Sequence, residues 1–119
     1  MLIAVTAKSA DPNSEVEPRF GRAPYFQIID TESDEIKVVE NSENVNAMQG
    51  AGIQAAESLA NTNADVLLTG HCGPKAFHTL KTAGIRIVVG VDGAVKEAVE
   101  RFKNNEYEYA ASPDVESHW

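Results

Sequence analysis

From residue 50 onward, short apolar runs alternate with segments of helical period, and this alternation most constrains the fold. The apolar runs are residues 66–68 and 86–89. Helical stripes of hydrophobic residues lie within residues 53–60, 77–83 and 95–102. Strands that alternate with helices pair in parallel, and their right-handed crossovers place the helices on the sheet faces. The second half of the chain therefore predicts a parallel sheet covered by helices.

The first half of the chain has a different pattern. Residues 2–7 are apolar without alternation, which is typical of a strand that is covered on both faces. Residues 25–30 and 36–40 also have strand character, and the polar residues 31–35 between them predict a hairpin. An antiparallel meander thus precedes the parallel half. Together the two halves predict an α/β fold, a three-layer sandwich with a mixed five-stranded sheet.

Length and composition indicate one soluble domain. The chain has 119 residues, of which 43% are hydrophobic, enough for a hydrophobic core. We expect the domain to span residues 1–103 and a tail without strong period, partly disordered, to span residues 104–119. No apolar run approaches the roughly 20 residues that cross a bilayer. The single cysteine, Cys72, excludes an internal disulfide and fits a cytoplasmic location.

The charge balance limits the classes of partner. With 18 acidic and 10 basic residues the net charge is −8, which argues against binding to a nucleic-acid backbone. Four of the cations nevertheless fall in loops rich in glycine, proline or polar residues: Lys8, Arg19, Arg22 and Lys75. These loop cations permit a local site for an anion.

Residues 69–75 join an expected strand to an expected helix and contain the most reactive side chains. Pro74 is typical of the first position of a helix, whose N–H groups favour an anion. Just before it lie Gly70, His71, Cys72 and Gly73, and Lys75 follows. A thiol, an imidazole and a cation beside a helix start indicate a site for an anionic or metal-containing ligand. The alternative is a tight turn in which Cys72 is simply a small residue.

Three motifs carry a resemblance to a known family. They are R-F-G-R-A-P-Y-F at residues 19–26, G-A-G-I at residues 50–53 and G-H-C-G-P-K-A at residues 70–76. Together they resemble the dinitrogenase iron–molybdenum cofactor biosynthesis family, the small NifX-like domains also found at the end of NifB-type proteins. The resemblance implies a ribonuclease H-like fold. It also implies a non-catalytic role, in which the protein binds or carries the iron–molybdenum cofactor or an iron–sulfur precursor.

The resemblance also implies where such a cluster binds. The loops 8–24 and 70–75 should meet at the carboxyl ends of the first and fourth strands, where sheets of this kind bind ligands. Cys72 and His71 are the candidate metal ligands. The other candidate binding residues are cations and glycines: Arg19, Arg22, Lys75, Gly21, Gly70 and Gly73. Arg19 stands where many members of the family have histidine, so one ligand is missing or replaced.

The implied partners are proteins that donate or accept the cluster. We expect a monomer or a weak homodimer. In such a dimer, two copies can share one cluster through their Cys72 thiolates.

Other functions remain as alternatives. A metal-dependent nuclease would need acidic residues on the first, central strand, and residues 2–7 contain none. A thiol enzyme could use Cys72, because a helix start lowers a cysteine pKa and His71 is a nearby base in sequence. A regulatory or protein-interaction module without a cofactor is a third possibility, which the polar loop 41–49 and the acidic surface permit.

Overall fold

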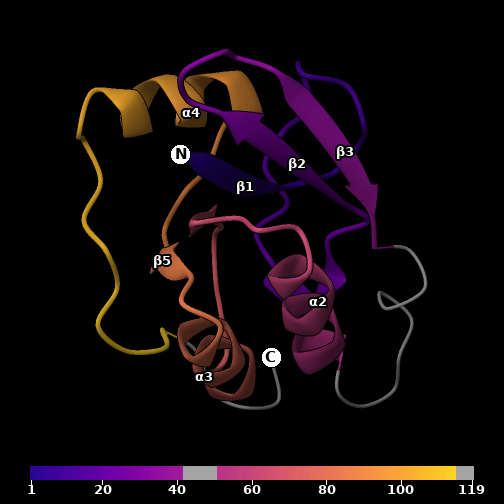
Figure 1. Cartoon of the computed structure of the whole chain (residues 1–119), viewed down its shortest axis with the longest axis vertical. Helices are drawn as coiled ribbons and strands as arrows, with labels where there is room; N and C mark the ends of the chain where they lie inside the picture. The colour runs from indigo at the N-terminus through magenta and orange to yellow at the C-terminus, as the bar shows by residue number, and fades with distance from the viewer. Residues whose placement is uncertain (42–50, 115–119) are drawn as a thin grey trace.

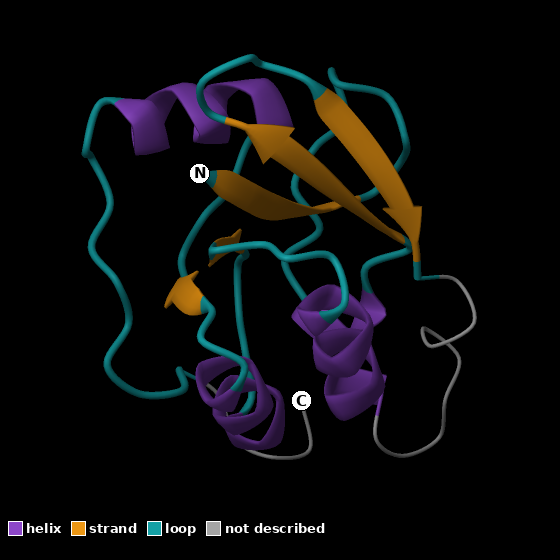
Figure 2. Ribbon diagram, viewed as in Figure 1, coloured by secondary structure: helices purple, strands orange, loops and turns teal. Residues whose placement is uncertain are grey.

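Five strands form one mixed sheet in the order β3-β2-β1-β4-β5 (Figures 1 and 2). This computed structural model describes residues 1–41 and 51–114. The strands are β1 (Leu2–Ala7), β2 (Tyr25–Asp30), β3 (Ile36–Glu40), β4 (Val66–Leu68) and β5 (Arg86–Val88). All five predicted strands are present, and β5 ends one residue earlier than expected.

The pairing of the strands confirms the two predicted halves of the sheet. β1 pairs antiparallel with β2, and β2 pairs antiparallel with β3. On its other side β1 pairs in parallel with β4, where Ile3 lies opposite Val66, and β4 pairs in parallel with β5. β1 is therefore the central strand, and its carboxyl end lies beside that of β4.

Three helices cover the two faces of the sheet. α2 (Ala51–Ala60) and α3 (Pro74–Thr82) lie on one face, and α4 (Val95–Lys103) lies on the other (Figure 1). Ala55 and Ala56 are fully buried in α2, and their small side chains allow this helix to pack close to the sheet. The predicted three-layer arrangement of α/β elements around a mixed five-stranded sheet is confirmed.

Burial on both faces explains the unbroken apolar sequence of β1. Ala4 packs into the cluster under α2 and α3, whereas Ile3 and Val5 pack into the cluster under α4. All three side chains are 0% exposed. Because successive side chains of a strand point to opposite faces, both faces of a strand between two helical layers must be apolar.

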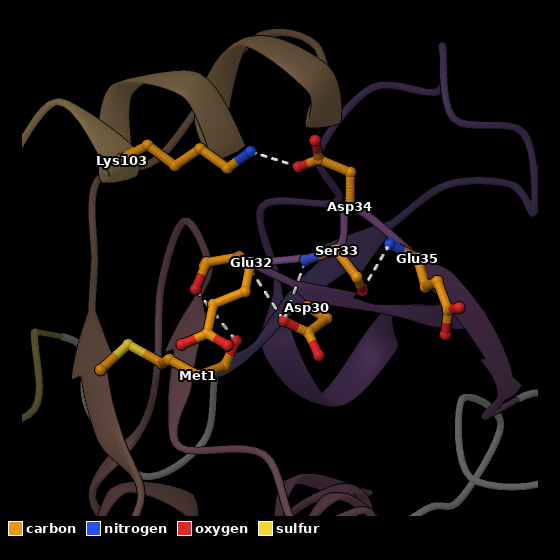
Figure 3. A network of polar contacts seen from close by, with 8 residues as sticks. Met1, Asp30, Glu32, Ser33, Asp34, Glu35 and Lys103 are labelled. Carbon is orange, nitrogen blue, oxygen red and sulfur yellow. Dashed lines mark hydrogen bonds and ion pairs between the residues drawn. The ribbon is translucent and has the colours of Figure 1, made fainter.

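The turn between β2 and β3 is fastened to α4 at the amino end of β1 (Figure 3). The Asp30 carboxylate accepts hydrogen bonds from the backbone N–H groups of Glu32 (2.8 Å) and Ser33 (3.4 Å), which lower the pKa of Asp30. Lys103 at the end of α4 forms an ion pair with Asp34 in the turn. This network lies at the end of β1 opposite to the loops 8–24 and 70–75, so it supports the fold and not the candidate site.

The described part of the tail packs beside β5. The Ala110 N–H donates to the Ile87 carbonyl at 2.7 Å, and the Arg86 guanidinium lies over the Tyr109 ring at 5.1 Å. Most of the predicted polar loop 41–49 falls outside the described residues, as do Gly50 of the second motif and His118 near the chain end. Within residues 1–41 and 51–114, no helix is both long and apolar enough to cross a membrane.

Candidate functional site

The loops 8–24 and 70–75 contact each other directly, as predicted. The His71 N–H donates to the Pro18 carbonyl at 2.6 Å, and the Phe20 N–H donates to the His71 carbonyl at 3.2 Å. Gly70 makes this approach possible, because a Cβ at that position would lie 2.6 Å from both the Cα and the carbonyl oxygen of Pro18. The backbones therefore meet at a distance that no side chain at residue 70 would permit.

Two buried threonines fix the beginning of the junction, which is the contact between the loops 8–24 and 70–75. Thr6 near the end of β1 and Thr69 just after β4 are both fully buried, and their hydroxyl oxygens lie 2.9 Å apart. The Thr6 hydroxyl donates to the Glu17 carbonyl at 2.7 Å, so the Thr69 hydroxyl is the donor in the pair. These bonds hold Glu17, and with it Pro18 and Arg19, against the carboxyl ends of the central strands.

Two helix starts converge beside the junction. The 3-10 helix η1 (Phe20–Arg22) lies against α2, where a Cβ on Gly21 would lie 2.9 Å from the Gly52 nitrogen. A Cβ on Gly52 would in turn lie 3.2 Å from the Ala76 Cβ in the first turn of α3. The first turns of α2 and α3 are therefore neighbours. Each presents the positive end of a helix dipole, which favours an anion.

The predicted cations differ in their surroundings. Arg19 and Lys75 are exposed and Arg22 is half-buried, and all three belong to segments that meet at the junction. Lys8 lies elsewhere, in an exposed ion pair with Glu15 at 3.3 Å. The junction thus brings together backbone segments that carry three cationic residues and two helix starts.

Cys72 points away from solvent into the hydrophobic core under α2 and α3. Its side chain is 1% exposed, and its sulfur contacts the Gly73 carbonyl at 3.7 Å. Burial, with a smaller contribution from the Asp114 charge, raises the pKa of the thiol to about 12. The sequence-based expectation of a lowered pKa at the helix start is wrong, because desolvation of the thiolate outweighs the helix dipole.

Asp114 is a site residue that sequence reasoning missed. One of its carboxylate oxygens accepts the Cys72 N–H at 2.8 Å, and the other lies 2.8 Å from the His71 Nδ1. Asp114 follows a tail without periodic pattern, so nothing in the local sequence indicates that it returns to residues 71 and 72. The contact joins the imidazole to the backbone before α3.

The donor set of the junction is small. Across residues 1–41 and 51–114, no three His, Cys, Asp or Glu side chains gather as a metal-binding group. At the junction, the two predicted ligands His71 and Cys72 can supply one imidazole and one thiol. An anionic group with ligands of its own suits such a site better than a bare metal ion, which needs a full set of protein ligands.

Known proteins resemble this chain over nearly its whole length. The orange protein from Desulfovibrio gigas, in its apo form, is 42% identical to this chain. The alignment covers 96% of each chain, and the two structures superpose with a TM-score of 0.93. An NMR structure of a protein from Thermotoga, proposed to be NifB, is 33% identical, with a TM-score of 0.83 and coverage of 96% of this chain and 97% of that one. Uncharacterized protein MJ0580 from Methanocaldococcus jannaschii is 32% identical over 98 residues, which are 81% of this chain and 83% of the relative.

A family comparison agrees with these relatives. The family described as dinitrogenase iron-molybdenum cofactor matches residues 1–105, which include the three motifs and every predicted site residue. The match ends shortly after α4, so the tail that carries Asp114 lies beyond it. On the strength of this match, the chain belongs to the dinitrogenase iron–molybdenum cofactor family.

Proposed function

We propose that the protein binds and carries an iron–molybdenum cofactor, or an iron–sulfur precursor of it, as a non-catalytic accessory protein. The observation that carries the proposal is the junction itself. There the first turns of α2 and α3 meet the loop that bears Arg19 and Arg22. A sulfide-rich, anionic cluster matches N–H groups, helix dipoles and cations better than it matches the acidic remainder of the surface.

The chemistry of the donors defines the proposed mode of binding. His71 and Cys72 are the proposed metal ligands, and Arg19, Arg22 and Lys75 balance the charge of the cluster. Gly21, Gly70 and Gly73 allow the backbone to approach it. The cluster arrives preformed, since one imidazole and one thiol leave most metal positions to its own sulfides. Ligation by Cys72 requires that the thiol loses its proton and that residues 70–75 open, because the sulfur is buried.

The relatives support this proposal. The match to the dinitrogenase iron-molybdenum cofactor family spans residues 1–105. The structure of the Desulfovibrio relative is of the apo form, the term for a protein without its bound group. We further propose that the protein is cytoplasmic, is a monomer or a weak dimer, and exchanges its cluster with donor and acceptor proteins. The strand order is consistent with the ribonuclease H-like fold that the family resemblance implies.

Anaerobic purification from iron- and molybdenum-replete cells tests the proposal. We expect bound iron, with or without molybdenum, and a visible absorption band in the wild-type protein. The variants His71→Ala and Cys72→Ala should lose metal and colour in parallel. His78→Ala is the matched control, since His78 is exposed on α3 outside the junction. Wild-type protein that is colourless and does not take up an offered cluster would refute the proposal.

One observation favours a second candidate, a protein-interaction module. Strand β3 lies at an edge of the sheet and exposes Ile36 (44%) and Val38 (37%). Exposed apolar residues on an edge strand suit pairing with another chain. The purification separates the two functions, because an interaction module stays colourless and binds partners through β3.

A further inference from the structure

We propose that the C-terminal tail is an autoinhibitory strap whose Asp114 carboxylate occupies the cluster site and leaves when the cluster binds. The proposal rests on the function proposed above and concerns the regulation of the same site. Its basis is that Asp114 is bonded to the very residues, 71 and 72, that the cluster would contact.

The contacts of Asp114 are those of an anion in a binding site. An ionised carboxylate is only an acceptor, so the Cys72 N–H donates to one oxygen at 2.8 Å and the His71 Nδ1 donates to the other at 2.8 Å. Asp114 is 26% exposed in its side chain and His71 is 40% exposed. The carboxylate therefore lies at the rim of the junction, between solvent and the start of α3.

An anionic cluster and Asp114 exclude each other at this place. The Cys72 N–H is a single donor and cannot serve the carboxylate and a cluster sulfide together. A carboxylate charge beside an anionic cluster would also repel it across a short distance. Departure of Asp114 removes the acceptor from two N–H donors, the Cys72 backbone and the His71 Nδ1. Both can then donate to sulfides of the cluster, while the His71 Nε2 is the nitrogen that can ligate a metal. The Asp114 contact thus closes the empty site, and its loss opens the site for the cluster.

Within the described part of the tail, Asp114 can leave its partners while residues 109 and 110 keep theirs. The last anchors before Asp114 are the Ala110 N–H bond to Ile87 at 2.7 Å and the Tyr109 ring under Arg86. Residues 111–113 separate these anchors from Asp114, and Ala111 and Ser112 are exposed. In Figure 1 the tail runs from α4 past β5 to α3, and the Asp114 bonds place its described end at residues 71 and 72, just before that helix. Asp114 can therefore move without disrupting the sheet.

Anaerobic titration with tetrathiomolybdate, a sulfide-rich molybdenum anion, tests the strap in the full-length chain. We expect Asp114→Asn to bind the anion about tenfold more tightly than wild type, because the neutral amide neither repels the anion nor holds the N–H as strongly. Glu108→Gln is the matched control, since it makes the same charge change at an exposed position of the tail. It should alter the affinity less than about twofold.

The outcomes separate the strap from the proposed function. Equal binding by wild type and Asp114→Asn overturns the strap alone, and weaker binding by Asp114→Asn shows that Asp114 positions His71 for the ligand instead. No binding by any variant overturns both proposals. Amide NMR spectra add a second readout: the anion should shift the Cys72 signal and sharpen those of residues 111–114 in wild type. Bound anion with unchanged tail signals would also overturn the strap.

Discussion

The Cys72 thiol lies just before α3, yet its pKa is raised to about 12 from an ordinary value of 9.0. The main cause is burial in the core under α2 and α3, and the Asp114 charge adds to it. A thiol with this pKa keeps its proton at neutral pH. Cys72 in the closed protein is therefore a core residue, and it becomes a soft ligand only if residues 70–75 move.

The raised pKa predicts how stability depends on pH. Between about pH 9 and pH 12 the unfolded chain loses the thiol proton while the folded protein keeps it, so the free energy of unfolding falls as pH rises. From pH 8 to pH 10, wild type should lose about 1.4 kcal/mol more than Cys72→Ala. Urea unfolding at several pH values measures this difference. Parallel pH profiles for the two proteins would show that the thiolate is not disfavoured by folding.

Sequence reasoning at the residue scale succeeds where the backbone itself constrains the residue type. From the sequence we expect Gly70 to let the backbone approach a ligand and Pro74 to begin a helix; in the structure Pro74 does begin α3, and the close approach at Gly70 is to the Pro18 backbone. Asp114 could not be predicted, because its role depends on a tail that returns across 42 positions of sequence to reach Cys72. The direction of the Cys72 pKa shift also depends on burial, which local sequence does not reveal.

At the scale of elements, the junction depends on how closely two loops and two helix starts approach each other. Replacing Gly70 by alanine places a Cβ 2.6 Å from Pro18 and must push the loops apart. We expect Gly70→Ala to lower the free energy of unfolding by about 1–3 kcal/mol. It should also weaken tetrathiomolybdate binding. Urea unfolding and anaerobic titration measure the two effects.

Gly84→Ala is the control for this prediction. Gly84 follows α3 at the end away from the junction, and its φ of +82° disfavours alanine although a Cβ there would have no atom within 4 Å. The variant should lose about 1–2 kcal/mol of stability through its backbone alone and bind the anion as wild type does. Equal loss of binding in both variants would mean that binding follows overall stability and not the junction.

The elements themselves are largely predictable. The period of α4 and the apolar run of β1 identify both without tertiary information, because α4 buries one face and β1 buries both. The contact between the first turns of α2 and α3 is not predictable in this way, because it depends on the meeting of Gly52 and Ala76 across the sheet face.

At the scale of the whole molecule, the sheet should be most stable at its centre. β1 is paired on both sides and buried on both faces, whereas β3 pairs with β2 at the sheet edge and exposes Ile36 and Val38. The slowest amides of β1 should exchange at least about a hundredfold more slowly than the slowest amides of β3. Native-state hydrogen exchange by NMR measures both. Equal rates would indicate that the whole sheet opens as one unit.

The charge of the whole molecule makes the junction stand out. With a net charge of −8, most of the surface repels an anionic cluster, so binding must rely on the local cations. Two of these local cations, Arg19 and Lys75, are exposed. Lys37 and Lys96 are also exposed, but they lie on β3 and α4, away from the junction. These two pairs make a comparison in which net charge and exposure are matched.

The central claim is that the junction binds a sulfide-rich metal anion, and anaerobic titration of these two double variants with tetrathiomolybdate tests it most directly. Arg19→Gln with Lys75→Gln should weaken binding by about 2 kcal/mol, roughly thirtyfold, because two cations near the anion are lost. Lys37→Gln with Lys96→Gln should change the affinity less than about threefold. Equal weakening in both double variants, or no change in the first, would contradict the claim that the cluster binds at this junction.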